Sequence, residues 1–314
     1  MRRDDGFLGF LIMLFGTRLR SLLAALVALT LFAATSPAAH AETDPAAATN
    51  NTEALGSLAR LTVSPVTLNG GGKLTLISPE RWSALSAEVV TTLKDAHVQL
   101  TSMFGEIPAF STSIRLTDQE SFHRATGAPK WTNALFYRGQ ILIPLALDTE
   151  PDMDNLRRSV RHEYTHAVVN ALSAGRAPGW IDEGLAQWIE GEENPALRPA
   201  LYHWLTKNDP VPLSLMQGGF TRLSPEMVPA AYAQSLFSAT VVINTFGFKS
   251  IRRYFDGLRD GLDKDAAFKA GFGLDSTIFE ARLTKTLHSW EAQQAVNYRK
   301  QRQQADAHQA SVRG

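Results

Sequence analysis

The alternation of hydrophobic and polar positions predicts strands in the first half of the chain. Residues 73–77 and 113–117 each alternate with a period of two, and a helical pattern fills residues 79–104 between them. Residues 134–137 and 140–144 predict a hairpin that turns at Arg138-Gly139. This half is therefore expected to be of mixed α and β structure.

The second half is predicted to be helical. In residues 154–175 apolar side chains recur at helical spacing after Asp154, a suitable N-cap, and Gly175 ends the pattern. The recurring positions are Leu156, Val160, Tyr164, Ala167 and Ala171. A further helix is expected to begin near Trp180, and helical patterns continue to about residue 290 without a convincing strand.

These patterns predict one α+β domain over residues 73–292, with an N-terminal α/β lobe and a C-terminal all-helical lobe. Before it, residues 42–72 are rich in Ala, Thr, Asn and Pro and close on three glycines, which predicts a linker. After it, residues 293–314 are polar, and we expect this tail to fray.

The first 41 residues have the pattern of a signal peptide. Arg18 and Arg20 precede an apolar run at residues 22–34, and Ala39-His40-Ala41 supplies the small residues of a cleavage site, so we expect cleavage after Ala41. An earlier apolar patch leaves both Met1 and Met13 open as the start.

Export is favoured over anchoring, because the apolar run is shorter than the roughly 20 residues of a spanning helix. No cysteine follows the run, which excludes a lipoprotein anchor. We expect a periplasmic or secreted protein with no stable membrane anchor.

Composition narrows the possible partners and metal ligands. Thirty-one basic residues balance thirty-one acidic ones, so no global charge favours nucleic acid or an anionic surface. The chain has no cysteine, which excludes disulfides and thiolate metal sites. Any metal site must therefore use His, Asp or Glu.

The residues His162-Glu163-Tyr164-Thr165-His166 form an HExxH motif. Positions four apart lie one turn above each other on a helix, so both imidazoles can bind one Zn²⁺ from the same face. Glu163 follows the first ligand and can reach toward the metal's open position, where a general base acts on water. The apolar flanks predict a buried helix in which these polar groups need a partner, and a metal ion provides one.

A third protein ligand is expected in the next helix, since catalytic zinc keeps three ligands and one site for water. The turn at residues 177–179 lets that helix run back past the histidines. Asp182 and Glu183 are both candidates, although acids in a first helical turn also occur without a metal. The acid that is not a ligand could orient a histidine.

The HExxH motif is followed by a W-x-x-E-G-x-A pattern, which is Trp180-Ile181-Asp182-Glu183-Gly184-Leu185-Ala186. This pair of motifs resembles the gluzincin clan of zinc metallopeptidases, particularly the peptidase-MA-like family of thermolysin-related domains. The resemblance extends over about residues 73–290. It implies a thermolysin-like zincin fold, a zinc cofactor, hydrolysis of peptide bonds, and Glu183 as the third ligand. It also implies that a peptide or protein substrate pairs with an edge strand before the HExxH helix, here the strand from Gln140 to Ile143.

The same family carries a Y-A-x-S element, found here as Tyr232-Ala233-Gln234-Ser235 at the start of a helix that ends at Gly247. In larger gluzincins a downstream tyrosine stabilises the oxyanion, so Tyr232 is a candidate for that role, with a core tyrosine as the equal alternative. Ser235 is a weaker candidate. His97, His123 and His203 are expected to be surface or core residues.

The sequence therefore predicts an exported zinc metallopeptidase with ligands His162, His166 and Glu183 and with Glu163 as general base. Two alternatives stay open: a zinc-binding periplasmic binding or assembly protein that cleaves nothing, and a zinc amidase that acts on cell-wall peptides. The intact Glu163 argues against the first, since a scaffold protein has no need of the base.

Overall fold

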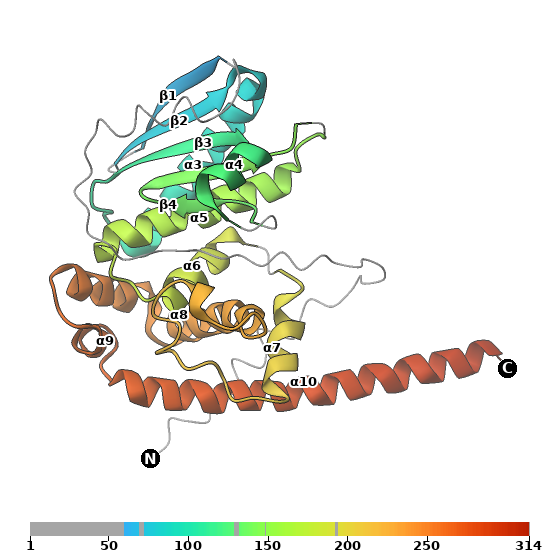
Figure 1. Ribbon diagram of the computed structural model, residues 1–314. Coiled ribbons are helices and arrows are strands. Elements are labelled where there is room, and N and C mark those ends of the chain that lie inside the picture. The colour runs from blue at the N-terminus through green and yellow to red at the C-terminus, as the bar shows by residue number, and fades with distance from the viewer. Residues whose placement is uncertain (1–59, 69–71, 129–131, 148, 192–193, 314) are drawn as a thin grey trace.

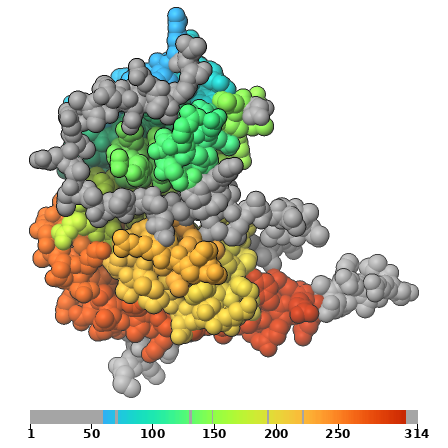
Figure 2. All heavy atoms as spheres, in the orientation of Figure 1, coloured from blue at the N-terminus to red at the C-terminus, as the bar shows by residue number. Residues whose placement is uncertain are grey.

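The computed structural model describes residues 60–68, 72–128, 132–147, 149–191 and 194–313. The predicted signal peptide, its cleavage site and most of the predicted linker lie outside these residues. A five-stranded sheet precedes a helical region (Figure 1). In Figure 2 these two lobes are the blue-to-green and the yellow-to-red parts of the surface. The structure is therefore α+β, with the predicted order of lobes.

The strands lie in the order β1-β2-β3-β5-β4. Strands β2, β3 and β5 are parallel, and β1 and β4 run antiparallel to their neighbours at the two edges. Their bounds are β1 (Leu61–Thr67), β2 (Lys73–Pro79), β3 (Ser111–Asp118), β4 (Leu135–Tyr137) and β5 (Gln140–Leu145). The predicted hairpin is confirmed: Arg138 and Gly139 have φ values of 50° and 74°, as a two-residue type I′ turn requires.

Strand β1 lies where the sequence predicted a linker, so that prediction is wrong for Leu61–Thr67. The strand pairs with β2 along its whole length. Only Val66 is buried, whereas the side chains of Leu61 and Val63 are 43% and 64% exposed. Backbone pairing rather than a hydrophobic face therefore holds this edge strand, and it lacks the burial alternation by which a strand is predicted.

Helices cover one face of the sheet. Alternate side chains of the inner strands are buried toward α3 (Ser83–Phe104) and α5 (Met153–Ser173). These side chains are Leu74, Leu76, Ile114, Leu116, Ile141 and Ile143. A 3₁₀ turn η1 (Glu80–Trp82) precedes α3, and α4 (Gln119–Thr126) follows β3.

Helix α5 lies between the sheet and the helical lobe (Figure 1). It begins after Asp152, whose side chain accepts hydrogen bonds from the backbone N–H groups of Asp154 and Asn155. The N-cap is thus Asp152, and the prediction of Asp154 is wrong by two residues. Residues 162–169 are all buried, so every polar side chain among them needs a partner.

The C-terminal lobe contains no strand among its described residues, as predicted. It consists of α6 (Gly179–Glu190), α7 (Leu197–Leu205), η2 (Phe220–Arg222), α8 (Val228–Arg259), α9 (Lys264–Phe272) and α10 (Ser276–Arg313). Helix α8 is interrupted at Gly247, where a helix end was predicted. The tail continues α10 as a helix to Arg313 and projects beyond the lobe (Figure 1). Whether this end frays in solution stays a prediction.

None of the helices in the described ranges is both long enough and apolar enough to span a membrane.

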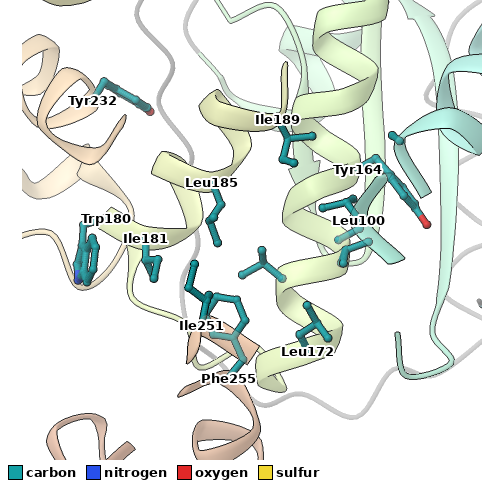
Figure 3. Packing of buried hydrophobic residues seen from close by; sticks show 14 of the residues in the cluster. Leu100, Tyr164, Leu172, Trp180, Ile181, Leu185, Ile189, Tyr232, Ile251 and Phe255 are labelled. Carbon is teal, nitrogen blue, oxygen red and sulfur yellow. The ribbon is translucent and has the colours of Figure 1, made fainter. Parts of the chain in front are cut away.

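Helix α6 packs between α5 and α8. Figure 3 shows Ile181 and Leu185 of α6 beside Ile251 and Phe255 of α8, and all four are fully buried. At Gly184 the two helices come so close that a Cβ atom would overlap the carbonyl oxygen of Ser235. The glycine of the E-G pair is therefore required by packing, and it sets the position of the residue before it.

We expect Gly184→Ala to lower the free energy of unfolding by about 1–3 kcal/mol, the usual cost of overpacking. Gly218→Ala is the matched control, because a Cβ atom there would meet open space; its effect should stay within about 0.5 kcal/mol. Urea denaturation of both variants measures the difference. Equal stability of the two variants would contradict the close approach of α6 and α8.

Candidate metal centre

The two histidines of the HExxH motif share one face of α5. Their ring centroids are 4.8 Å apart, and the residues are 1% (His162) and 6% (His166) exposed. Residues four apart on a helix lie on the same face, so the spacing alone predicts this pair. Both Nε2 atoms are directed toward α6, as their distances to Glu183 show.

Glu183 reaches the same point from α6. The chain reverses after α5, so that α6 runs back across the histidines. Atom Oε2 of Glu183 lies 3.6 Å from Nε2 of His162 and 3.9 Å from Nε2 of His166. Ligand atoms bound to a tetrahedral zinc at 2.0–2.1 Å are about 3.3–3.4 Å apart. The carboxylate of Glu183 therefore lies within about half an ångström of the separation that zinc coordination needs from each imidazole. The three ligand atoms together lie within 4.8 Å of one another, so they must draw closer around a bound metal.

The surroundings of Glu183 fit a cation. Its Oε2 atom is buried and makes no hydrogen bond, although it faces two imidazole nitrogens. A buried carboxylate oxygen without a hydrogen bond is costly, and a cation held between the three side chains would lower that cost. Two imidazole nitrogens and one carboxylate oxygen form the donor set of many catalytic zinc sites.

Asp182, the competing acid, lies on the outer side of the histidines. Its Oδ1 atom is 2.9 Å from Nδ1 of His166, and its side chain is 31% exposed. The nitrogen of His166 that faces Glu183 is Nε2, so Asp182 contacts the opposite side of that ring. Asp182 therefore occupies the place of an orienting carboxylate, while Glu183 occupies the place of a ligand.

Glu190 plays the corresponding part for His162, and sequence reasoning missed it. Its Oε2 atom lies 2.9 Å from Nδ1 of His162, and its side chain is only 6% exposed. The residue is seven positions after Glu183 on α6, which is two helical turns, so both carboxylates face α5. That spacing was the signal available in the sequence.

Carboxylates dominate the electrostatics of the two histidines. Burial alone would lower the pKa of each imidazole, but Glu183 and Glu190 raise the pKa of His162 well above its usual value. In the same way Asp182 and Glu183 raise the pKa of His166 to about 9. Burial would raise the pKa of Glu183, yet the histidines bring it below its usual value. The cluster thus favours positive charge at its centre.

Glu163 is held by the sheet. The side chain is buried, and its Oε2 atom accepts a 2.6 Å hydrogen bond from the backbone N–H of Phe136 in β4. Burial raises the pKa of Glu163, and the nearby charges of His162 and His166 offset this only in part. A carboxylate with a raised pKa is suited to accept a proton and to return it.

Tyr232 and Ser235 lie on α8, behind α6. The ring of Tyr232 is buried and packs edge-on against Phe220 at 4.9 Å, and its carbonyl oxygen accepts a hydrogen bond from Gln187 of α6. Figure 3 shows Tyr232 across α6 from Tyr164 of α5. An oxyanion role for Tyr232 stays a prediction. The hydroxyl of Ser235 donates to the carbonyl of Ala231 in the same helix.

The structure corrects the position of the edge strand. The strand from Gln140 to Ile143 is part of β5, which lies inside the sheet between β3 and β4. The edge near the histidines is β4, the other arm of the hairpin. The error arose because a hairpin pattern does not reveal which arm also pairs with a third strand.

Of the remaining histidines, His97 is a buried core residue whose Nδ1 atom lies 2.9 Å from the hydroxyl of Tyr164. His123 contacts the carbonyl of Ala128 through Nδ1. Neither is part of the ligand cluster, as expected.

Three solved structures that match part of this chain are larger than it. Aminopeptidase A from Legionella pneumophila in complex with aspartic acid is 16% identical, with a TM-score of 0.46; the match covers 72% of this chain and 28% of that one. The M1 zinc metallopeptidase from Deinococcus radiodurans is 16% identical, with a TM-score of 0.40; the match covers 74% of this chain and 50% of that one. An aminopeptidase N family protein from Idiomarina loihiensis is 12% identical, with a TM-score of 0.42; the match covers 71% of this chain and 46% of that one. The chain thus spans half or less of each structure.

No curated protein matches the sequence significantly. The sequence profile of the Peptidase MA superfamily, however, matches residues 92–289. This match runs from the middle of α3 into α10 and includes β4, the HExxH helix and the part of α6 that carries Glu183. The chain therefore belongs to the Peptidase MA superfamily.

Proposed function

We propose that the protein is an exported zinc metallopeptidase that hydrolyses peptide bonds. The observation that carries the proposal is the convergence of three ligand atoms from His162, His166 and Glu183 within 4.8 Å of one another. Glu163 adjoins this cluster and is held by Phe136 of the edge strand. A buried metal-binding cluster with an adjacent carboxylate of raised pKa is the arrangement that metal-assisted hydrolysis needs.

Export is the part of the proposal that comes from the sequence alone. It is supported by the basic residues, the apolar run at residues 22–34 and the small residues that end at Ala41. The mature enzyme would act in the periplasm or outside the cell.

Zinc, when bound through Nε2 of both histidines and a carboxylate oxygen of Glu183, would lower the pKa of a water molecule and polarise the scissile carbonyl. Glu163 would accept the proton of this water and return it to the leaving amine. Phe136 occupies Oε2 of Glu163, which leaves Oε1 to carry the proton. Asp182 and Glu190 would keep the two imidazole rings oriented through their Nδ1 atoms.

The proposed peptide or protein substrate would lie along β4. Among the described residues this strand pairs only with β5, and the N–H of Phe136 is directed away from β5, toward Glu163. An extended peptide added at this edge would pass beside the general base. The N–H of Phe136 already donates to Glu163, so a substrate would pair with other backbone groups along this edge. Such pairing would place a scissile bond next to the cluster whatever side chains the peptide carries.

Glu163→Gln should lower kcat by about 10²–10⁴-fold, because glutamine keeps the shape of the side chain but cannot accept the proton. Zinc per chain should not change. Hydrolysis of mixed peptides and of peptidoglycan, with and without chelator, measures the effect, and Glu120→Gln on the exposed surface of α4 is the control. Wild-type turnover in Glu163→Gln would refute the assigned base.

The same assay on the wild-type protein distinguishes the alternative functions. Cleavage of peptidoglycan alone would favour the cell-wall amidase, and zinc binding without any cleavage would favour the binding protein.

Glu183→Gln should weaken zinc binding more than Asp182→Asn does. The first change removes the charge of a ligand, whereas the second removes a partner of His166, a loss that typically costs 10–100-fold in metal affinity. Zinc content and the zinc dissociation constant of the two folded variants decide between the acids. A larger loss in Asp182→Asn would show that the ligand is misassigned.

Zinc affinity should rise with pH at least tenfold per pH unit between pH 6 and 8.5. Below a pKa of about 9 the metal-free His166 carries a proton, which zinc must displace because it binds neutral imidazole. Chelator competition at several pH values measures the slope. Asp182→Asn should flatten it, since that carboxylate helps to raise the pKa of His166. A pH-independent affinity of the wild-type protein would contradict histidine ligation.

A further inference from the structure

Arg158 extends the line of contacts that leads away from the ligand cluster. It lies four residues before His162 on α5, so Arg158, His162 and His166 form one stripe along the helix. The Nη2 atom of Arg158 donates a hydrogen bond of 3.3 Å to Oε1 of Glu190. The other oxygen of Glu190 lies 2.9 Å from Nδ1 of His162. Contacts thus lead from Arg158 to the carboxylate of Glu190 and from there to the imidazole of His162.

The two outer carboxylates differ in burial. The side chain of Asp182, which contacts His166, is 31% exposed, so water can solvate its second oxygen. The side chain of Glu190 is 6% exposed, and in place of water its second oxygen meets Arg158. A buried carboxylate that lost this contact would keep one oxygen poorly satisfied. Glu190 therefore depends on Arg158 in a way that Asp182 does not depend on any arginine or lysine among the described residues.

We propose that Arg158 is a positioning residue of the metal centre, which acts through Glu190. By holding Oε1, it fixes the plane of the carboxylate so that Oε2 faces Nδ1 of His162. That contact keeps the proton on Nδ1 and leaves the lone pair of Nε2 for the metal. This inference rests on the proposed zinc site, because the position of His162 matters only if Nε2 is a ligand.

The contact is a single hydrogen bond from one end of the guanidinium. The Nε atom of Arg158 is buried and makes no hydrogen bond, so the bidentate pairing that distinguishes arginine from lysine is absent. A lysine that reaches Glu190 could therefore supply both the charge and the donor. This makes Arg158→Lys a conservative variant that should preserve the function, while Arg158→Met removes it.

Arg157 provides a matched control on the same helix. It pairs with Glu88 and Asp154 and does not contact Glu190. Arg157→Met removes the same charge from the neighbouring position. Any general effect of a lost arginine on α5, on net charge or on zinc attraction at long range should appear in both methionine variants.

The experiment measures the zinc dissociation constant of the mature protein by competition with a chromophoric chelator. We expect Arg158→Met to weaken zinc binding about tenfold or more, the usual effect of losing an orienting contact. Arg158→Lys and Arg157→Met should bind as the wild-type protein does. In a Glu190→Gln background, Arg158→Met should cause little further loss, because the arginine acts through that carboxylate.

Two results would overturn the proposal: wild-type zinc affinity in Arg158→Met, or losses from Arg158→Met and Glu190→Gln that simply add in the double variant. If either occurs while Glu183→Gln still abolishes tight binding, the zinc site stands and only the role of Arg158 is refuted. If the wild-type protein itself binds no zinc, both proposals fail.

Discussion

The proposed metal centre depends on the burial of several ionisable side chains of α5 and α6. Glu163, Glu183, Glu190, His162 and His166 are each less than 7% exposed. An isolated buried charge is very costly, whereas opposite charges in contact reduce the cost. The imidazoles of α5 face the carboxylates of α6 across the interface, so these groups are in contact with opposite charges. The register of the two helices is consequently constrained, because a shift by one residue would separate every pair.

The contact of α6 with α8 fixes the same register from the other side. Gly184 allows the two backbones to approach at Ser235. The side-chain amide of Gln187 donates to the carbonyl oxygens of Glu183 and Tyr232 and so joins the helices one turn later. The position of Glu183 is thus set by the packing of α6 against α8. The backbone of α6 already places its carboxylate beside the histidines.

The placement of the candidate residues could be predicted from the sequence where the geometry is local. The pair His162 and His166, with Glu163 beside them, follows from the period of a single helix. The proposed third ligand, Glu183, required a turn and a family resemblance, since the spacing alone left Asp182 and Glu183 open. Glu190 was missed although its two-turn separation from Glu183 was visible, because nothing in the sequence states which face of α6 meets α5.

The fold shows the same limit. Both arms of the β4–β5 hairpin were predicted from alternation and from Arg138-Gly139, yet the edge was assigned to the wrong arm. Edge and interior are decided by the parallel pairing of β5 with β3, a contact between segments separated by a helix. Strand β1 was missed for a related reason, since pairing with β2 stabilises it without a buried face.

The site lies where the two lobes meet, and this has a thermodynamic consequence. The α/β lobe supplies the hydrogen bond from Phe136 to Glu163, whereas the helical lobe supplies Glu183 through α6. Helix α5 carries the histidines and contacts both. A metal ion bound to all three ligands would therefore be bound only when α6 is docked on α5, and its binding free energy would add to the stability of that interface. Zinc would thus hold the lobes together as well as take part in the chemistry.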